Sequence, residues 1–182
     1  MTTAPGTYSL ETPDARLTIH TSRVGAASRA GHDLLIEVER WGATVEIAPD
    51  PAQSVFELNA DSRSLTVLEG TGGIKALGDD DRSSIVKTIN DEVLKGASIS
   101  FRSTAVRPEG DGRFHVTGDL EIANGISLIA FEITIGDDGR LTGGATVRQT
   151  EWGIKPYSAL FGALKVADEV KVQVEGTLKP AP

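Results

Sequence analysis

Cysteine is absent from this chain of 182 residues. Disulfide bonds, thiolate metal sites and cysteine nucleophiles are therefore excluded. Positive charge is also scarce, with 18 Lys and Arg against 26 Asp and Glu and a net charge of −8. Such a chain lacks the basic face that attracts a nucleic acid or an anionic membrane surface, so we expect neither as a partner.

Long apolar runs and targeting signals are missing as well. No segment of the sequence approaches the roughly 18 consecutive apolar residues of a membrane-spanning helix. The beginning, MTTAPGTYSL, has neither the basic stretch nor the apolar stretch of a secretory signal. We therefore expect a cytoplasmic protein without a membrane span, folded as one domain over residues 1–182.

Motifs of known enzyme and cofactor sites are also lacking. The sequence has no G-x-S-x-G nucleophile elbow, and residues 69–78, EGTGGIKALG, fit neither the Walker spacing nor the dinucleotide spacing. The three histidines, His20, His32 and His115, do not have the short spacing of a familiar metal site. Paired carboxylates occur where a turn or a helix start would use them. We expect no catalysis, no cofactor and no metal.

Period-two alternation of apolar and polar residues, in contrast, is abundant. Residues 169–178, EVKVQVEGTL, place Val170, Val172 and Val174 on one face and the polar residues on the other. The same alternation recurs in six further segments, at residues 15–22, 42–48, 54–62, 98–106, 113–122 and 141–150. Turn signals separate the segments, so the pattern predicts an antiparallel all-β fold, either a sandwich or a barrel.

Two segments depart from this alternation. Residues 126–135, ISLIAFEITI, are apolar on both faces at their start, which predicts a strand whose outer face is covered too. Residues 79–96, DDDRSSIVKTINDEVLKG, carry apolar residues at helical spacing between an acidic start and Gly96. They predict one principal helix over about 80–95. We expect it to cover either the open end of a barrel or the apolar strand.

Large apolar residues concentrate on one irregular segment, residues 150–170, TEWGIKPYSALFGALKVADEV. Gly and Pro interrupt it, so it fits neither one regular helix nor one regular strand. Only 5% of the chain is aromatic, yet this segment holds Trp152, Tyr157 and Phe161, with Leu160 beside them. Two interpretations stay open. The segment either plugs the end of a barrel or lines and gates an apolar cavity.

Four stretches follow one another in a familiar order: GTYSLETPDARLTIHTSRVGAASRAGHDLLIEVERWGATVEI, then DEVLKGASISFRSTAV, then LEIANGISLIAFEITI, and finally RQTEWGIKPYSALFGALKVADEVKVQVEGTL. In this order and spacing they resemble the YceI-like family over nearly the whole chain. That family consists of lipocalin-like antiparallel barrels that bind polyisoprenoid or other amphiphilic lipid chains. The resemblance implies a single lipocalin-like β-barrel of about eight strands and no assigned catalysis.

We therefore expect a non-catalytic protein that sequesters or carries a polyisoprenoid, an isoprenoid quinone or a similar amphiphilic lipid in an apolar barrel cavity. The expected ligand contacts are Phe101, Phe131, Trp152, Tyr157, Leu160 and Phe161. His32 either bonds nearby backbone in a turn or meets the ligand head group at the barrel mouth. Two alternatives stay open: a barrel filled by its own side chains, with a structural or interaction role, and a small β-barrel enzyme. Monomer and homodimer also both remain open.

Overall fold

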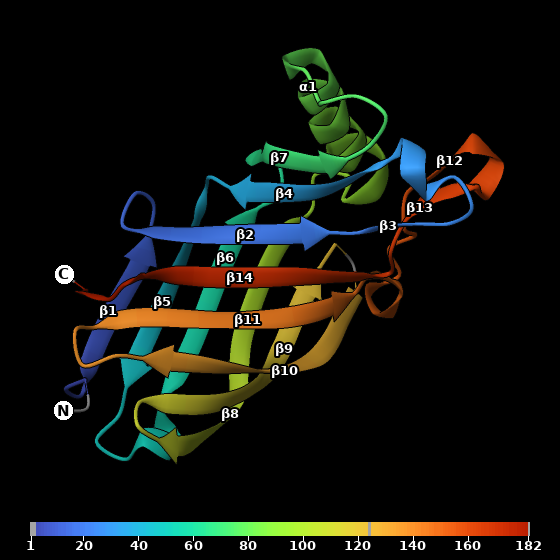
Figure 1. Ribbon diagram of the computed structural model, residues 1–182. Helices are drawn as coiled ribbons and strands as arrows, with labels where there is room; N and C mark the ends of the chain where they lie inside the picture. Colours follow the sequence, from blue (N-terminus) through green and yellow to red (C-terminus); the bar gives the residue numbers. More distant parts are fainter. Residues whose placement is uncertain (1–2, 124, 182) are drawn as a thin grey trace.

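The computed structural model describes residues 3–123 and 125–181, and strands dominate it (Figure 1). Twelve strands form one curled sheet: β1 (Gly6–Glu11), β2 (Ala15–Thr21), β4 (His32–Val38), β5 (Trp41–Ile47), β6 (Val55–Asp61), β7 (Leu65–Gly72), β8 (Ser98–Gly110), β9 (Arg113–Ile122), β10 (Gly125–Ile135), β11 (Arg140–Arg148), β14 (Glu169–Thr177) and β15 (Lys179–Pro180). A smaller sheet holds β3 (Arg23–Val24), β12 (Ser158–Ala159) and β13 (Leu164–Val166).

The large sheet has the order β15-β1-β5-β6-β8-β9-β10-β11-β14-β2-β4-β7. Neighbouring strands are antiparallel, as the alternation predicts, for example β9 with β10 and β11 with β14. The order begins at β15 and ends at β7, so over the described residues the sheet curls into a half-barrel. The predicted all-β, antiparallel architecture is confirmed in this form.

The predicted count of about eight strands is wrong, for two physical reasons. In β4 three large apolar residues follow one another at 34–36, and this run hides the alternation of the strand. The strands β3, β12, β13 and β15 are only two or three residues long. A strand of that length is defined by its hydrogen-bonded partner and contains too few residues to show a period.

Helix α1 (Asp79–Thr88) continues as one turn of π-helix, η3 (Ile89–Val93), close to the predicted span of 80–95. Its first turn is capped by Asp81, which accepts a hydrogen bond from the Gly78 backbone N–H at 3.1 Å. The apolar residues of this helical stretch pack against the core from one side; they are Ile85, Val86, Ile89, Val93 and Leu94. Figure 1 shows α1 standing beside β7, at one end of the half-barrel.

The helix does not cover the apolar strand at 126–135. Ile126 and Leu128 on the outer face of β10 are 66% and 61% exposed. The prediction that this outer face is covered is therefore wrong. Apolar residues on both faces of a strand indicate burial on both faces only if a second layer lies over the sheet.

Arg82 fastens α1 to the edge of the sheet. It donates hydrogen bonds from Nη1 to the backbone carbonyls of Val67, at 2.7 Å, and Leu68. Both carbonyls belong to β7, the last strand in the sheet order, next to an irregularity where the register with β4 shifts. One side chain of the helix therefore pairs with backbone groups that the ladder leaves available.

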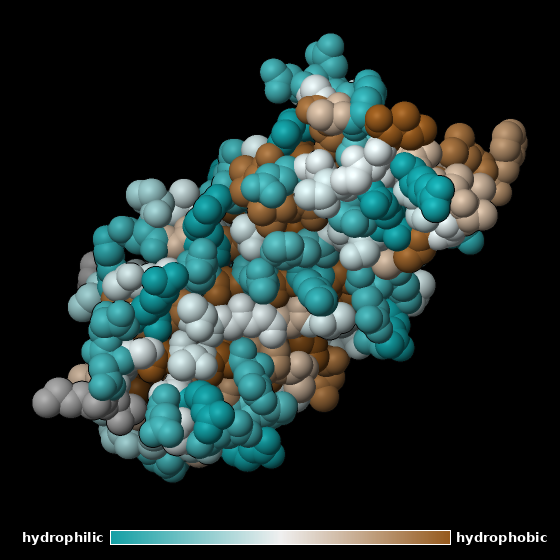
Figure 2. Space-filling model, in the orientation of Figure 1, coloured by the Kyte–Doolittle hydropathy of each residue, from teal (hydrophilic) through white to brown (hydrophobic). Residues whose placement is uncertain are grey.

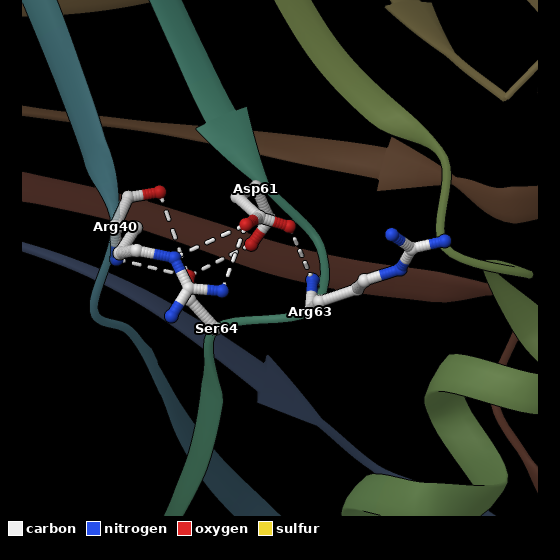
Figure 3. Close-up of polar contacts among 4 residues, drawn as sticks. All are labelled: Arg40, Asp61, Arg63 and Ser64. Atoms are coloured by element: carbon white, nitrogen blue, oxygen red, sulfur yellow. Dashed lines mark hydrogen bonds and ion pairs between the residues drawn. The ribbon is translucent and has the colours of Figure 1, made fainter.

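Four polar residues, Arg40, Asp61, Arg63 and Ser64, hold two strand connections together, and we call them the polar corner (Figure 3). The chain passes from β4 to β5 through Arg40 and from β6 to β7 through residues 62–64. Arg40 donates to Asp61 Oδ2 from Nη2 at 2.8 Å and from Nε at 3.1 Å, and its backbone N–H donates to Ser64 Oγ at 2.9 Å. Asp61 Oδ1 accepts the Arg63 backbone N–H at 2.8 Å. The bond from Arg40, with that from Arg63, lowers the pKa of Asp61.

Large apolar side chains fill the half-barrel at the end near the β8–β9 and β10–β11 turns. We call this region the packed half, defined by Leu10, Val45, Ile47, Phe56, Phe114, Val116, Ile133, Ile135 and Leu141, all of which are buried. The rings of Phe56 and Phe114 meet there at a centroid distance of 5.9 Å and a tilt of 60°. Tight packing of this kind is typical of a protein core.

Candidate ligand cavity

The other end of the half-barrel is hollow. It encloses a cavity of about 640 Å³, within the roughly 300–1,000 Å³ that is typical of small-molecule sites. We call this region the hollow half. Its walls come from the large sheet, from α1 and from the segment after β11, and they include Ile19, Leu34, Leu58, Ile85, Ile129, Val170, Val172 and Val174. Most of these side chains are aliphatic and only partly buried, because they face open space instead of one another.

Two phenylalanines form an aromatic part of this wall. Phe101 on β8 and Phe131 on β10 have ring centroids 5.2 Å apart at a tilt of 58°. Gly118, on the strand between them, permits this arrangement. A Cβ atom at Gly118 would lie 2.6 Å from a ring carbon of Phe101, closer than carbon atoms can approach. Both rings lie on the cavity wall.

Polar and charged side chains join the wall around the mouth of the cavity. They include Arg23, His32, Lys75, Asp81 and Lys165. His32 Nε2 donates to the Lys75 carbonyl at 2.8 Å, and Arg23 Nη1 donates to the Gly31 carbonyl at 2.8 Å. The cavity therefore combines an apolar interior with a polar rim, which matches the two ends of an amphiphilic molecule.

Thr21 places a free hydroxyl on this wall. Its Oγ1 is buried and has no hydrogen-bond partner among residues 3–123 and 125–181. A buried hydroxyl without a partner is costly, and this atom has almost no surface that a ligand could contact. Sequence reasoning missed it, although the signal was present: Thr21 shares the inward parity of Leu17 and Ile19 on β2.

The predicted site residues do not all come together. Phe101, Phe131, Tyr157 and His32 line the cavity. Trp152 is buried but lies outside the cavity wall, and its Nε1 donates to the Leu120 carbonyl at 2.6 Å. Leu160 and Phe161 are also outside the wall; Leu160 is 56% exposed and Phe161 is fully exposed.

One part of segment 150–166 plugs the core, another part lines the cavity, and a third part is exposed to solvent. Trp152 packs into the core as a plug, while Tyr157, Leu164 and Val166 contribute to the cavity wall. Between these parts, the short turn η5 (Leu160–Gly162) carries its large side chains into solvent. The sequence predicts the apolar character of this segment but not which way each side chain points.

No group of three or more His, Cys, Asp or Glu residues in the described part of the chain is arranged to hold a metal ion. None of the described helices has both the length and the apolar character needed to cross a membrane.

Comparison with known families shows to which family this chain belongs. A family model described as the YceI-like domain matches residues 8–178. The chain belongs to the YceI-like family. The resemblance in the sequence is thereby confirmed, while no curated protein matches the chain.

Solved structures share this YceI-like fold at low sequence identity. Burkholderia cenocepacia BcnA is 16% identical with a TM-score of 0.66, over 90% of this chain and 94% of that one. A polyisoprenoid binding domain from Saccharophagus degradans, implicated in plant cell wall breakdown, is 9% identical with a TM-score of 0.61, over 98% and 100%. The Campylobacter jejuni YceI protein is 11% identical with a TM-score of 0.58, over 81% and 84%. At these identities the likeness establishes the fold alone.

Proposed function

We propose that this protein binds an amphiphilic lipid, with a polyisoprenoid or isoprenoid quinone chain inside the cavity and the head group at the rim. The observation that carries the proposal is the 640 Å³ cavity, apolar inside and polar at its mouth. Burying an apolar chain contributes about 0.8 kcal/mol per CH₂, so a prenyl chain needs few polar contacts to bind. Membership of the YceI-like family and the fold shared with a polyisoprenoid binding domain support the same conclusion.

The head group would meet the polar residues at the rim of the cavity, such as Lys165. Some polar wall groups already have partners: the amide nitrogen of Gln149 donates to the Ala167 carbonyl at 2.9 Å, and His32 Nε2 donates to the Lys75 carbonyl. The exposed Lys165 ammonium group can donate to a carbonyl or hydroxyl oxygen of the ligand. His32 then acts mainly on the shape of the mouth, because it ties β4 to the loop before α1.

The protein acts by binding, without catalysis. Among the described residues Asp81 is the one carboxylate on the cavity wall, and its pKa is lowered by the hydrogen bond from the Gly78 N–H and by Lys75. A carboxylate with a lowered pKa is a weak base, and here it caps a helix. The size of the cavity also argues against the filled-barrel alternative. A cytoplasmic location stays a prediction from the sequence.

A cavity-filling variant tests the proposal. Ala145 on β11 lines the cavity, whereas its neighbour Thr146 is exposed on the outer face. Ala145→Phe should abolish calorimetric binding of a short-chain prenyl quinone, and Thr146→Phe should leave it unchanged. Lys165→Met should weaken binding about 3- to 10-fold, the scale of one hydrogen bond. Full quinone binding by a folded Ala145→Phe variant would refute a ligand site in this cavity.

A further inference from the structure

Two large apolar side chains project into solvent beside the cavity mouth. We call Leu160 and Phe161 the tip. Both residues have positive φ angles, 51° and 55°, a region that side chains other than Gly and Asn seldom adopt. Figure 2 shows apolar side chains gathered on the projection that Figure 1 labels β12 and β13. Exposed apolar groups of this kind mark contact surfaces.

The tip stands on a fixed support. Strand β13 pairs with β12 on one side and with β3 on the other, and the Ala27 N–H donates to the Ala163 carbonyl at 2.8 Å. The backbones approach so closely that a Cβ at Gly25 would lie 2.4 Å from that carbonyl oxygen. Leu164 and Val166, which follow the tip, line the cavity. The position of the tip relative to the cavity mouth is therefore fixed by this backbone support.

Positive charge gathers on the same two loops. Residues 22–32 and 153–167 contain Arg23, Arg29, Lys155 and Lys165 and no Asp or Glu, in a chain whose net charge is −8. Arg29, Lys155 and Lys165 are exposed and have no ion-pair partner within the described residues. The two loops are therefore locally positive, although the chain as a whole is negative.

We propose that the tip and these three basic residues dock the protein on an anionic lipid bilayer. The apolar side chains would enter the headgroup region while the basic residues meet anionic lipids, the two terms that together hold peripheral proteins on membranes. The cavity mouth would then face the bilayer, so an apolar chain could pass between them without crossing water. Docking itself does not depend on what the cavity holds.

A bilayer suits this surface better than a second copy of the chain. A two-fold contact places the same patch of both subunits face to face. The three unpaired basic residues would then meet their own equivalents, and like charges repel. A surface rich in anionic headgroups offers the opposite charge and accepts apolar side chains of any shape.

Sedimentation of the full chain with lipid vesicles tests the proposal. Vesicles of phosphatidylcholine with about one third phosphatidylglycerol should bind the wild-type protein more tightly than phosphatidylcholine alone. The double variant Leu160→Asn/Phe161→Asn should lower the partition coefficient at least about 10-fold, since two large apolar groups are lost. Asn adopts positive φ readily, so this variant keeps the fold, which circular dichroism checks.

Matched variants sharpen the test. Leu128→Thr removes a similarly exposed leucine from the outer face of β10 and should change the partition coefficient less than 2-fold. Arg29→Gln/Lys155→Gln should lower binding to the anionic vesicles about 10-fold or more and leave binding to phosphatidylcholine unchanged. Prenyl quinone binding in solution should persist in the tip variant, which separates docking from the cavity function. The proposal would be overturned if the tip variant bound vesicles as well as wild type does. It would also be overturned if wild type bound no vesicles and instead formed a dimer that the tip variant dissociates.

Discussion

The packed half and the hollow half of the molecule share the same strands. On β10, Ile133 and Ile135 are 3% and 4% exposed and belong to the packed half. Phe131 and Ile129, two and four residues earlier with the same inward parity, line the cavity instead. β9 has the same division: Phe114 and Val116 belong to the packed half, while Leu120 and Ile122 face the cavity.

The difference lies in what stands opposite each side chain. In the packed half an inward residue meets another large side chain, as Phe56 meets Phe114. In the hollow half inward residues such as Ile129 and Val172 line the cavity instead, although they are also apolar. Inward parity therefore states where a side chain points, whereas the side chains opposite it decide whether it packs in the core or lines the cavity.

The largest effect is expected in the packed half. Phe114→Ala should lower the free energy of unfolding by about 3–5 kcal/mol, because a buried ring is replaced by a void. Chemical denaturation with a constant slope measures this loss. The comparison between the halves would fail if this variant were as stable as a cavity-wall variant.

Phe131→Ala is the matched change in the hollow half. It should lower the free energy of unfolding by only about 1–2 kcal/mol, because one side of this ring already faces open space. It should also weaken prenyl quinone binding about 10-fold, since the ligand loses an apolar contact. A stability loss equal to that of Phe114→Ala, with unchanged quinone affinity, would assign Phe131 to the core.

The polar corner should respond to acid. The folded-state pKa of Asp61 is lowered, first by its hydrogen bond with Arg40, so Asp61 stabilises the fold above its ordinary pKa of about 4. This contribution is lost as the pH falls below about 4 and through the lowered pKa. The stability difference between wild type and Asp61→Asn should accordingly be constant above about pH 5 and shrink below about pH 4. A difference that stays constant down to pH 2 would contradict the role of this pair.

The smallest effect is expected at the tip. Phe161→Asn should change the free energy of unfolding by less than about 0.5 kcal/mol, because the side chain is fully exposed and Asn tolerates its positive φ angle. Thermal and chemical denaturation would both detect a larger change. A loss above about 2 kcal/mol, the scale of a buried aromatic residue, would place Phe161 inside the protein.

Much of the fold could be predicted from local patterns. Alternation along residues such as Val170, Val172 and Val174 identified many of the long strands, although not β1, β4 or β7, and helical spacing around Ile85 and Ile89 identified the helix. The small sheet of β3, β12 and β13 could not be predicted, because β3 pairs with a segment that lies far away in the sequence. The open half-barrel likewise depends on how distant strands are ordered, which no local period records.

The candidate site was predictable only in part. Phe101 and Phe131 followed from inward parity, and Thr21 could have followed from the same rule. Trp152, Tyr157 and Phe161 stand close together in the sequence, yet they lie in the core, on the cavity wall and in solvent. In an irregular segment each side chain direction depends on individual backbone angles, such as the positive φ of Leu160 and Phe161, and composition carries no record of them.

The bond between Arg82 and β7 bears on how the protein avoids self-association. An uncovered edge strand offers free carbonyl and N–H groups to any other extended chain, and pairing of this kind starts aggregation. Arg82 occupies two carbonyls of β7, so the helix shields the edge as well as closing the cavity. Loading a ligand by swinging α1 away would bare this edge each time, whereas loading beside β13 would keep it protected throughout.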